Sequence, residues 1–233
     1  MNNRVVLITG SRKGIGFLLV KYFIDKGYKV IGCSRGESDY VHKDYYFIQC
    51  DVTNDLMVKS VVKLGCKKFG TIDILINNAG IASLNHSILT PLSTVKKVFE
   101  TNFNGSFLFS RECAKIMIKK KEGRIINFST VAVPMSLEGE MIYASSKSAV
   151  ESMSKILSKE LSKFNITVNT VGPTPIDTDL TRVVPKDKLD KIINDQTIKR
   201  FGKVEDIINV IEFFINKKSS FITGQTIYLG GVC

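Results

Sequence analysis

Long apolar runs are missing from this 233-residue sequence. No segment approaches the ~18 uninterrupted apolar residues that a membrane-spanning helix needs. The apolar run that follows Arg4 is short and lacks the cleavage site of a signal peptide. We therefore expect a cytoplasmic protein with no membrane partner.

Paired cysteines and clustered histidines are missing as well. The five cysteines form no Cys-x-x-Cys pair and their number is odd, which favours free thiols in a reducing compartment over a disulfide framework. The two histidines, His42 and His86, have no partner at the spacing of a metal site. We expect no bound metal and exclude a zinc enzyme.

The charge is strongly positive, with 33 Lys and Arg against 22 Asp and Glu. The lysines are spread over the expected helices, and no basic stripe interleaved with aromatic residues is present, so we expect no nucleic-acid partner. The excess suits an acidic protein partner. It could equally reflect a bias in composition, since Asn and Ile are also frequent.

Short apolar, β-branched segments alternate with amphipathic helical segments, and no internal repeat or low-complexity linker interrupts them. Apolar strands separated by helices are typical of a parallel sheet covered on both faces. Right-handed crossovers then predict an α/β fold with a doubly wound, seven-stranded parallel sheet in a single domain. The expected strands are 4–9, 29–34, 45–50, 72–77, 123–130, 166–172 and 225–230, and the expected helices are 14–26, 54–69, 93–120, the Tyr143 helix, 185–196 and 204–215.

A glycine-rich turn, "TGSRKGIG", follows the first expected strand and opens the first helix. Glycines allow a tight turn and let backbone amides approach a pyrophosphate, whose charge also favours a helix N-terminus. Ligands of doubly wound sheets bind at the carboxyl ends of the strands, where this turn lies. The turn therefore predicts a nucleotide site.

The glycine spacing begins a resemblance to the short-chain dehydrogenase/reductase family, and most of all to its 3-oxoacyl-[acyl-carrier-protein] reductases. The motifs of the resemblance follow one another through nearly the whole chain: 9–16, "DV" at 51–52, "NNAG" at 77–80, Asn102, "IINFST" at 125–130, Tyr143 with Lys147, "ITVNTVGPTPIDT" at 166–178 and "ITGQTIYLGG" at 222–231. The resemblance implies a Rossmann fold in one domain, 1–233, with a substrate lid around 178–196.

The residues after the second strand indicate which cofactor is used. Enzymes that select NAD carry a carboxylate there for the ribose hydroxyls, whereas this chain has Ser34 and Arg35. A guanidinium can hold the additional 2′-phosphate, and Arg12 or Lys13 offers a second cation. We therefore predict NADP(H) in preference to NAD(H).

The resemblance also implies individual cofactor contacts. Asp51 and Val52 would meet the adenine, 78–80 would line the adenine ribose, and Ile176 and Thr178 would hold the nicotinamide carboxamide. The full predicted set is Gly10, Ser11, Arg12, Gly14, Ile15, Gly16, Ser34, Arg35, Asp51, Val52, Asn78, Ala79, Gly80, Tyr143, Lys147, Pro173, Ile176 and Thr178.

Tyr143 and Lys147 are four residues apart in "YASSK", so on a helix they share one face. Taken alone, such a pair is also typical of an amphipathic surface. Lowering a tyrosine pKa from about 10 to about 7 takes roughly 4 kcal/mol, which a cation about 4 Å away supplies at an effective dielectric near 20. We expect Lys147 to lower the pKa of Tyr143, assisted by the oxidised nicotinamide, so that Tyr143 acts as the acid.

Three further roles come from the resemblance. Lys147 would also hold the nicotinamide ribose, and Asn102 would hold a water in a proton relay. The hydroxyl that polarises the carbonyl would be that of Thr130, with Ser129 as the alternative, although Ser129 should point to the opposite face of its strand. Thr174 stands where the family has glycine, and Pro175 stiffens the same loop.

These features predict NADPH-dependent reduction of a carbonyl to a secondary alcohol, with a 3-oxoacyl thioester as substrate. The alternatives are an oxidoreductase of a sugar, ketone or secondary metabolite, and a non-catalytic NADP(H)-binding sensor or scaffold. An acidic acyl carrier protein is an expected partner, and the chain is expected to form a homotetramer or a dimer. Of two basic positions that such reductases use near the carrier, one is kept as Lys121 and the other is Phe164 beside Lys163.

Overall fold

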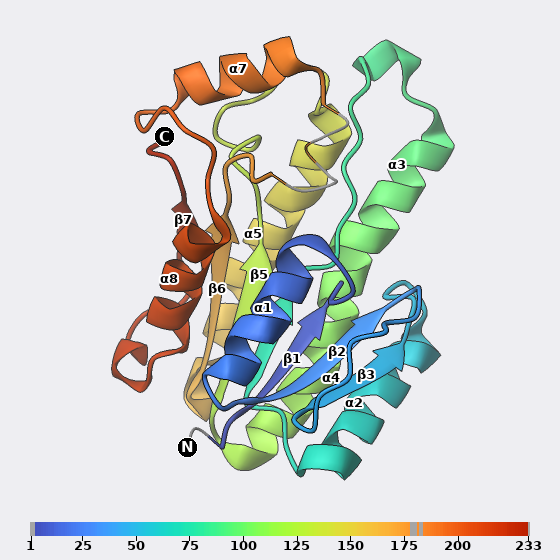
Figure 1. The fold of residues 1–233 in the computed structure, drawn as a ribbon, viewed down its shortest axis with the longest axis vertical. Coiled ribbons are helices and arrows are strands. Elements are labelled where there is room, and N and C mark those ends of the chain that lie inside the picture. Colours follow the sequence, from blue (N-terminus) through green and yellow to red (C-terminus); the bar gives the residue numbers. More distant parts are fainter. Residues whose placement is uncertain (1–2, 178–180, 182–183, 233) are drawn as a thin grey trace.

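Seven parallel strands form one sheet in the computed structural model, which describes residues 3–177, 181 and 184–232. The strand order across the sheet is β3-β2-β1-β4-β5-β6-β7 (Figure 1). This order confirms the predicted doubly wound α/β fold. The strands are β1 (Val5–Thr9), β2 (Lys29–Ser34), β3 (Tyr45–Gln49), β4 (Ile74–Asn77), β5 (Gly123–Phe128), β6 (Ile166–Gly172) and β7 (Thr226–Tyr228).

The helices follow the strands along the chain as predicted, with one difference. The helix expected over 93–120 is two helices joined by a π-helical turn, Glu100–Asn104. The α-helices are α1 (Gly14–Asp25), α2 (Asp55–Phe69), α3 (Leu92–Phe99), α4 (Gly105–Lys120), α5 (Met141–Leu161), α7 (Lys186–Asp195) and α8 (Val204–Ile215).

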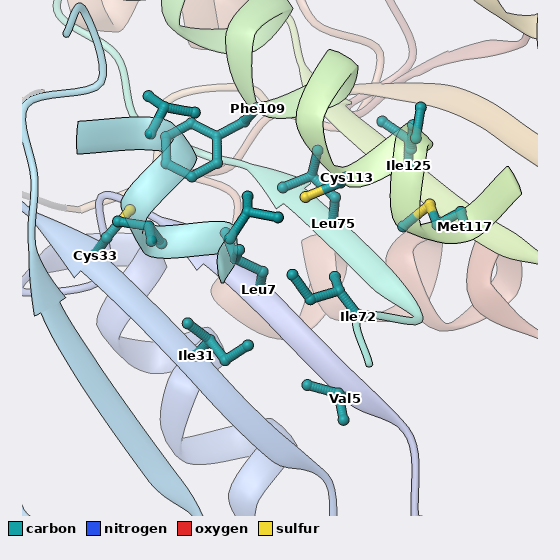
Figure 2. Close-up of a cluster of buried hydrophobic side chains, with 14 of the residues drawn as sticks. Val5, Leu7, Ile31, Cys33, Ile72, Leu75, Phe109, Cys113, Met117 and Ile125 are labelled. Atoms are coloured by element: carbon teal, nitrogen blue, oxygen red, sulfur yellow. The ribbon is translucent and has the colours of Figure 1, made fainter. Parts of the chain in front are cut away.

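Two apolar cores lie on the two faces of the sheet, because successive side chains of a strand point to opposite faces. On β1, Val5 and Leu7 belong to the core that includes residues of α2, α4 and α5, whereas Val6 and Ile8 pack with α1 and α8. Figure 2 shows Val5 and Leu7 in this core with side chains of α4. Burying one such side chain contributes roughly 1.5–3 kcal/mol. Both faces of the sheet are therefore covered, as the apolar strands predicted.

Local sequence signals fix the ends of α2. Asn54 caps the helix by accepting a hydrogen bond from the Met57 amide at 3.1 Å, and Gly70 ends it in the left-handed region at φ +85°. Side-chain capping and a terminal glycine together explain why this predicted helix, 54–69, is reproduced within one residue.

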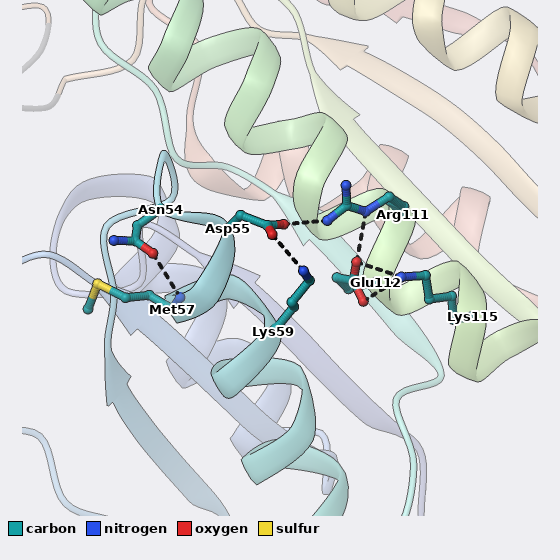
Figure 3. Close-up of polar contacts among 7 residues, drawn as sticks. All are labelled: Asn54, Asp55, Met57, Lys59, Arg111, Glu112 and Lys115. Atoms are coloured by element: carbon teal, nitrogen blue, oxygen red, sulfur yellow. Dashed lines mark hydrogen bonds and ion pairs between the residues drawn. The ribbon is translucent and has the colours of Figure 1, made fainter.

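A network of charges joins α2 to α4 on the surface (Figure 3). Arg111 of α4 bonds both Asp55 of α2 and Glu112, while Lys59 and Lys115 complete the two ion pairs. Hydrogen bonds from Lys59 and Arg111 lower the pKa of Asp55. The ion pairs of Asp55 are partly exposed and stabilise little individually, whereas Glu112 is buried between its two cations.

All seven strands point the same way, so their carboxyl ends meet at one edge of the sheet. Helix α7 lies beyond this edge, at the top of Figure 1. Within the described ranges, no helix combines the length and the apolar character needed to cross a membrane.

Candidate active site

A cleft of about 690 Å³ lies at the carboxyl ends of the strands. It runs from the glycine turn and the end of β2, past the end of β5, to the start of α5 and to α7. Most predicted site residues line it: Gly10, Arg12, Gly14, Ile15, Ser34, Arg35, Asp51, Val52, Asn78, Ala79, Gly80, Ser129, Thr130, Tyr143, Lys147, Pro173 and Ile176.

Two predicted cofactor contacts are corrected by the structure, and a third lies outside the described residues. Ser11 is fully buried, its amide donates to the Cys33 carbonyl, and its Oγ lies 3.2 Å from Tyr45 Oη, so it does not line the cleft. Gly16 packs behind the loop, where a Cβ would lie 2.2 Å from the Gly10 oxygen. Ser11 and Gly16 therefore support the glycine turn on the side that faces away from the cleft. Thr178 is the one outside the described residues.

The glycine turn presents backbone amides to the cleft. Gly10 and Gly14 adopt φ values of +67° and +57°, which L side chains rarely reach. The Lys13 side chain does not cap α1, and Gly14 and Ile15 at the start of this helix line the cleft. The Asn78 amide holds the turn by donating to the Thr9 carbonyl at 2.9 Å and to the Gly10 carbonyl at 3.3 Å. This geometry fits a pyrophosphate.

Two guanidinium groups lie at the end of the cleft beside β2. Arg12 donates its amide to Ser34 Oγ at 3.1 Å, and its side chain lies along Gly36, where a Cβ would be 3.2 Å from Nε. Arg35 follows the strand, and both arginine side chains are exposed. Asp51, from the end of β3, instead turns its carboxylate toward its own loop. The donors at this end fit an anionic group.

Tyr143 and Lys147 lie one turn apart on α5 and line the cleft together with Thr130, which follows β5. The Thr130 hydroxyl is close enough to Tyr143 to lower the pKa of the phenol. Lys147 is only 3% exposed, and its Nζ donates to the Phe128 carbonyl at 2.9 Å. The structure thus brings the three predicted catalytic side chains to one wall.

Neighbouring Ser129 has a different partner. Its hydroxyl donates to the carboxylate of Glu151 on α5, which also accepts from Tyr228 Oη at 2.6 Å. Thr130, by contrast, accepts from the Ala132 amide and lowers the pKa of Tyr143. This geometry favours Thr130 over Ser129 as the hydroxyl beside the tyrosine.

The pKa of Tyr143 is raised to about 12, mainly by burial and then by the Glu140 carboxylate, while the hydrogen bond with Thr130 lowers it. The prediction that Lys147 lowers this pKa is therefore wrong for the protein alone. Burial lowers the pKa of Lys147 itself to about 8. Its ammonium is bonded to the Phe128 carbonyl, and it does not offset the desolvation of the tyrosine.

Asn102 lies in the π-helical turn, fully buried and outside the cleft lining. Its Nδ2 donates to the Ile81 carbonyl and to Ser146 Oγ, both at 3.0 Å, and its Oδ1 accepts from the Ile81 amide at 2.9 Å. Both Nδ2 hydrogens are thus used by protein partners. The side chain braces the loop after β4 against α5, where we had predicted a water-holding role.

Sequence reasoning missed Glu140, which lines the cleft three residues before Tyr143. It also missed the apolar side chains that α7 contributes, Leu189 and Ile192. The spacing argument that paired Tyr143 with Lys147 could have found Glu140, because positions three apart also share a helix face.

The loop after β6 departs from the family pattern without backbone strain. Thr174 avoids the left-handed region, and it lines the cleft while only 6% exposed. Elsewhere in the described ranges, no three His, Cys, Asp or Glu side chains are grouped closely enough to hold a metal.

The parallel sheet, the glycine turn after β1 and the tyrosine–lysine wall together define a dinucleotide-binding oxidoreductase of the Rossmann type. The sequence profile of the family described as short chain dehydrogenase matches residues 4–189, and the chain belongs to this family. It is therefore an enzyme of the class that interconverts alcohols and carbonyls with a nicotinamide cofactor.

Named relatives cover almost the whole chain. The 3-oxoacyl-[acyl-carrier-protein] reductase FabG of Escherichia coli is 32% identical over 98% of this chain and 96% of its own length. The FabG reductase of Vibrio cholerae is 31% identical over 99% and 97%. The ligand-free structure of Thermoplasma acidophilum aldohexose dehydrogenase has a TM-score of 0.88 at 29% identity and covers 98% of this chain and 93% of that one.

Proposed function

We propose that this protein reduces the carbonyl of a 3-oxoacyl thioester to a secondary alcohol with NADPH. The observation that carries the proposal is one continuous cleft with the glycine turn and two arginines at one end and Thr130, Tyr143 and Lys147 at the other. The full-length similarity to two FabG reductases supports the thioester as substrate.

The nucleotide end would hold NADPH through complementary charge. Amides of the glycine turn and the start of α1 bind the pyrophosphate. Arg12 and Arg35 hold the 2′-phosphate, the group that distinguishes NADPH from NADH. Lys147 reaches the nicotinamide ribose. When bound, the cofactor supplies a hydride for the carbonyl carbon.

At the catalytic wall, the carbonyl oxygen accepts hydrogen bonds from Thr130 Oγ1 and Tyr143 Oη. These donors stabilise the negative charge that develops on the oxygen as the carbon is reduced. Tyr143 then transfers its proton to that oxygen. A tyrosine pKa of about 12 keeps the phenol protonated at neutral pH, which suits an acid in the reductive direction. Lys147, with a pKa of about 8, can return a proton to the phenolate.

A second candidate substrate is a sugar or another hydroxylated carbonyl compound. The similarity to an aldohexose dehydrogenase and the Glu140 carboxylate in the cleft favour it. A non-catalytic NADP(H) sensor is a third possibility. The convergence of Thr130, Tyr143 and Lys147 on one wall argues against such a sensor.

The proposal extends to partners. An acidic acyl carrier protein would meet a chain whose formal net charge is +11, and Lys121 at the end of α4 is one basic position for that contact. We further propose a homotetramer or dimer that works in the cytoplasm.

The test is NADPH consumption with acetoacetyl-CoA, an acetoacetyl carrier protein, simple ketones and aldohexoses, each also run toward oxidation with NADP⁺ and the corresponding alcohol. We expect the thioesters to be reduced fastest. Faster turnover of an aldohexose would replace the thioester assignment with the sugar one. Tight NADPH binding without turnover of any compound would support the sensor.

A further inference from the structure

Glu140 lies at the start of α5, one turn before Tyr143. Its carbonyl accepts the first helical hydrogen bond, from the Ala144 amide at 2.8 Å, so its side chain projects from the same turn as that of Tyr143. Both side chains line the cleft. Glu140 is the N-cap residue of α5, and its carboxylate is close enough to Tyr143 to raise the pKa of the phenol. A ligand whose carbonyl reaches Tyr143 therefore also reaches Glu140.

The Glu140 carboxylate has no hydrogen-bond partner in the part of the chain that the structure describes. Within the described residues its oxygens make no hydrogen bond and no ion pair closer than 4.0 Å, although the side chain is half-buried. Burial raises its pKa, and the Lys188 ammonium of α7 opposes this rise from outside the cleft lining. A partly desolvated carboxylate without a donor is costly, and a donor that arrives with a ligand relieves that cost.

The rest of this end of the cleft offers few alternatives. Leu137, Val184, Leu189 and Ile192 supply apolar walls. The other acidic side chains that line the described cleft are Asp51 and Glu100. Asp51 accepts hydrogen bonds from the Thr53 amide and hydroxyl. Glu100 is exposed. Glu140 is thus the half-buried acceptor that a substrate meets beside the tyrosine.

From this arrangement we propose that Glu140 selects carbonyl substrates that carry a hydrogen-bond donor near the reacting carbon, which is a hydroxyl or an ammonium group in a small ketone and an amide N–H of the pantetheine arm in a 3-oxoacyl thioester. The inference rests on the proposed function, because it takes the carbonyl to be reduced beside Tyr143. It adds a substrate-binding residue whose partner is the body of the substrate. Substrates without the donor leave the carboxylate desolvated and bind less well.

Three ketones of similar shape test the proposal: 4-hydroxycyclohexanone, 1-methyl-4-piperidone in its ammonium form, and 4-methylcyclohexanone, which has no donor. The measured quantity is kcat/KM with NADPH for each ketone, expressed as a ratio to the methyl compound. We expect ratios of roughly 10 to 100 for both donor-bearing ketones, the range of one hydrogen bond to a charged group.

Variants of Glu140 separate the two donors. Glu140→Leu should reduce both ratios to about 1, because neither donor then has an acceptor. Glu140→Gln keeps an amide oxygen for the hydroxyl but loses the charge, so the ammonium ratio should fall more than the hydroxyl ratio. The matched control is Glu138→Gln, an exposed carboxylate in the same loop, which should leave both ratios within about threefold.

Lys188→Gln tests whether Glu140 serves only to hold α7. If the carboxylate acts through the substrate, the ratios persist in Lys188→Gln and collapse in Glu140→Leu. The proposal would be overturned if kcat/KM fell equally for all three ketones in both Lys188→Gln and Glu140→Leu. It would also be overturned if the wild-type ratios of kcat/KM were close to 1. Failure of the proposed function looks different, since the wild-type protein would then reduce none of these ketones and no thioester.

Discussion

The two ends of the cleft bind by different means. At the nucleotide end, the proposed contacts come from backbone amides of the glycine turn and from the exposed side chains of Arg12 and Arg35. At the substrate end, the side chains that we propose to carry the chemistry are buried or half-buried, and the pKa values of Tyr143 and Lys147 are displaced to about 12 and about 8. Anchoring an anion needs only donors in the right geometry, whereas proton transfer needs groups whose pKa values the protein has shifted.

Of the groups at the two ends of the cleft, only those at the substrate end lower the stability of the folded protein. Exposed arginines at the nucleotide end remain hydrated and lose little on folding. Lys147 is almost fully buried with one carbonyl as its partner, so its charged form is destabilised in the folded protein. Substitutions at the substrate end should therefore change both turnover and the pH dependence of folding. Those at the nucleotide end should change cofactor choice alone.

The largest expected effect is at Tyr143. Tyr143→Phe removes the proton donor and keeps the ring, so kcat for carbonyl reduction should fall roughly 10²- to 10⁴-fold. NADPH affinity, measured by the change in NADPH fluorescence on binding, should stay within about fivefold, because the nucleotide end is untouched. A parallel loss of affinity and turnover would show that the two ends are not separable.

The separation of the two ends also explains what could be read from the sequence. The parallel sheet and the glycine turn follow from apolar periodicity and from the backbone freedom of Gly10 and Gly14, both of which are local properties. The position of Thr130 beside the tyrosine was expected from the family resemblance, and both residues line the cleft.

The parts that the sequence did not reveal depend on packing. In the protein without cofactor, the pKa of Tyr143 shifts in the direction opposite to the one predicted with the oxidised nicotinamide bound, because the folded cleft excludes solvent from the phenol. The bracing role of Asn102 depends on a π-helical turn, a one-residue irregularity that no periodicity predicts. Ser11 and Gly16 lie behind the turn because tertiary contacts with Cys33 and Gly10 hold them there.

The second-largest expected effect is on the pH dependence of the free energy of unfolding, and it comes from Lys147. Its pKa falls from 10.5 to about 8 on folding, so between these pH values the unfolded chain binds more protons than the folded one. Stability therefore rises with pH across this window, by up to about 3 kcal/mol from this group. Lys147→Met removes the titration. The difference in free energy of unfolding between the wild type and the variant, from urea titrations between pH 7.5 and pH 10, should grow with pH by that order.

Other groups titrate in the same range, which is why the difference between the two proteins is the useful quantity. Tyr143 acts in the opposite direction, because its pKa rises from 10.0 to about 12 on folding and stability is lost as pH rises between those values. Keeping the titration below pH 10 leaves that contribution out. A difference that stays constant with pH would mean that Lys147 keeps its ordinary pKa in the folded protein.

At the nucleotide end, Arg35→Ala should raise the KM for NADPH roughly 10- to 100-fold, since a phosphate contact with a charged donor contributes about 1.5–3 kcal/mol. Arg12→Ala should act in the same direction. NADH is the internal control, because it lacks the 2′-phosphate and its kcat/KM should change less than threefold. If kcat/KM falls equally with NADPH and with NADH, the two arginines support the loop and do not select NADPH.

The smallest effect is expected at Ser129, which precedes Thr130 in the sequence. Ser129→Ala removes one hydrogen bond to Glu151 while Tyr228 keeps the other, so the free energy of unfolding should fall by about 1 kcal/mol. Its kcat should change far less than in Thr130→Val, where the loss of a donor to the carbonyl oxygen slows reduction roughly 10²-fold. A larger kcat loss in Ser129→Ala than in Thr130→Val would transfer the carbonyl contact to Ser129, which also lines the cleft.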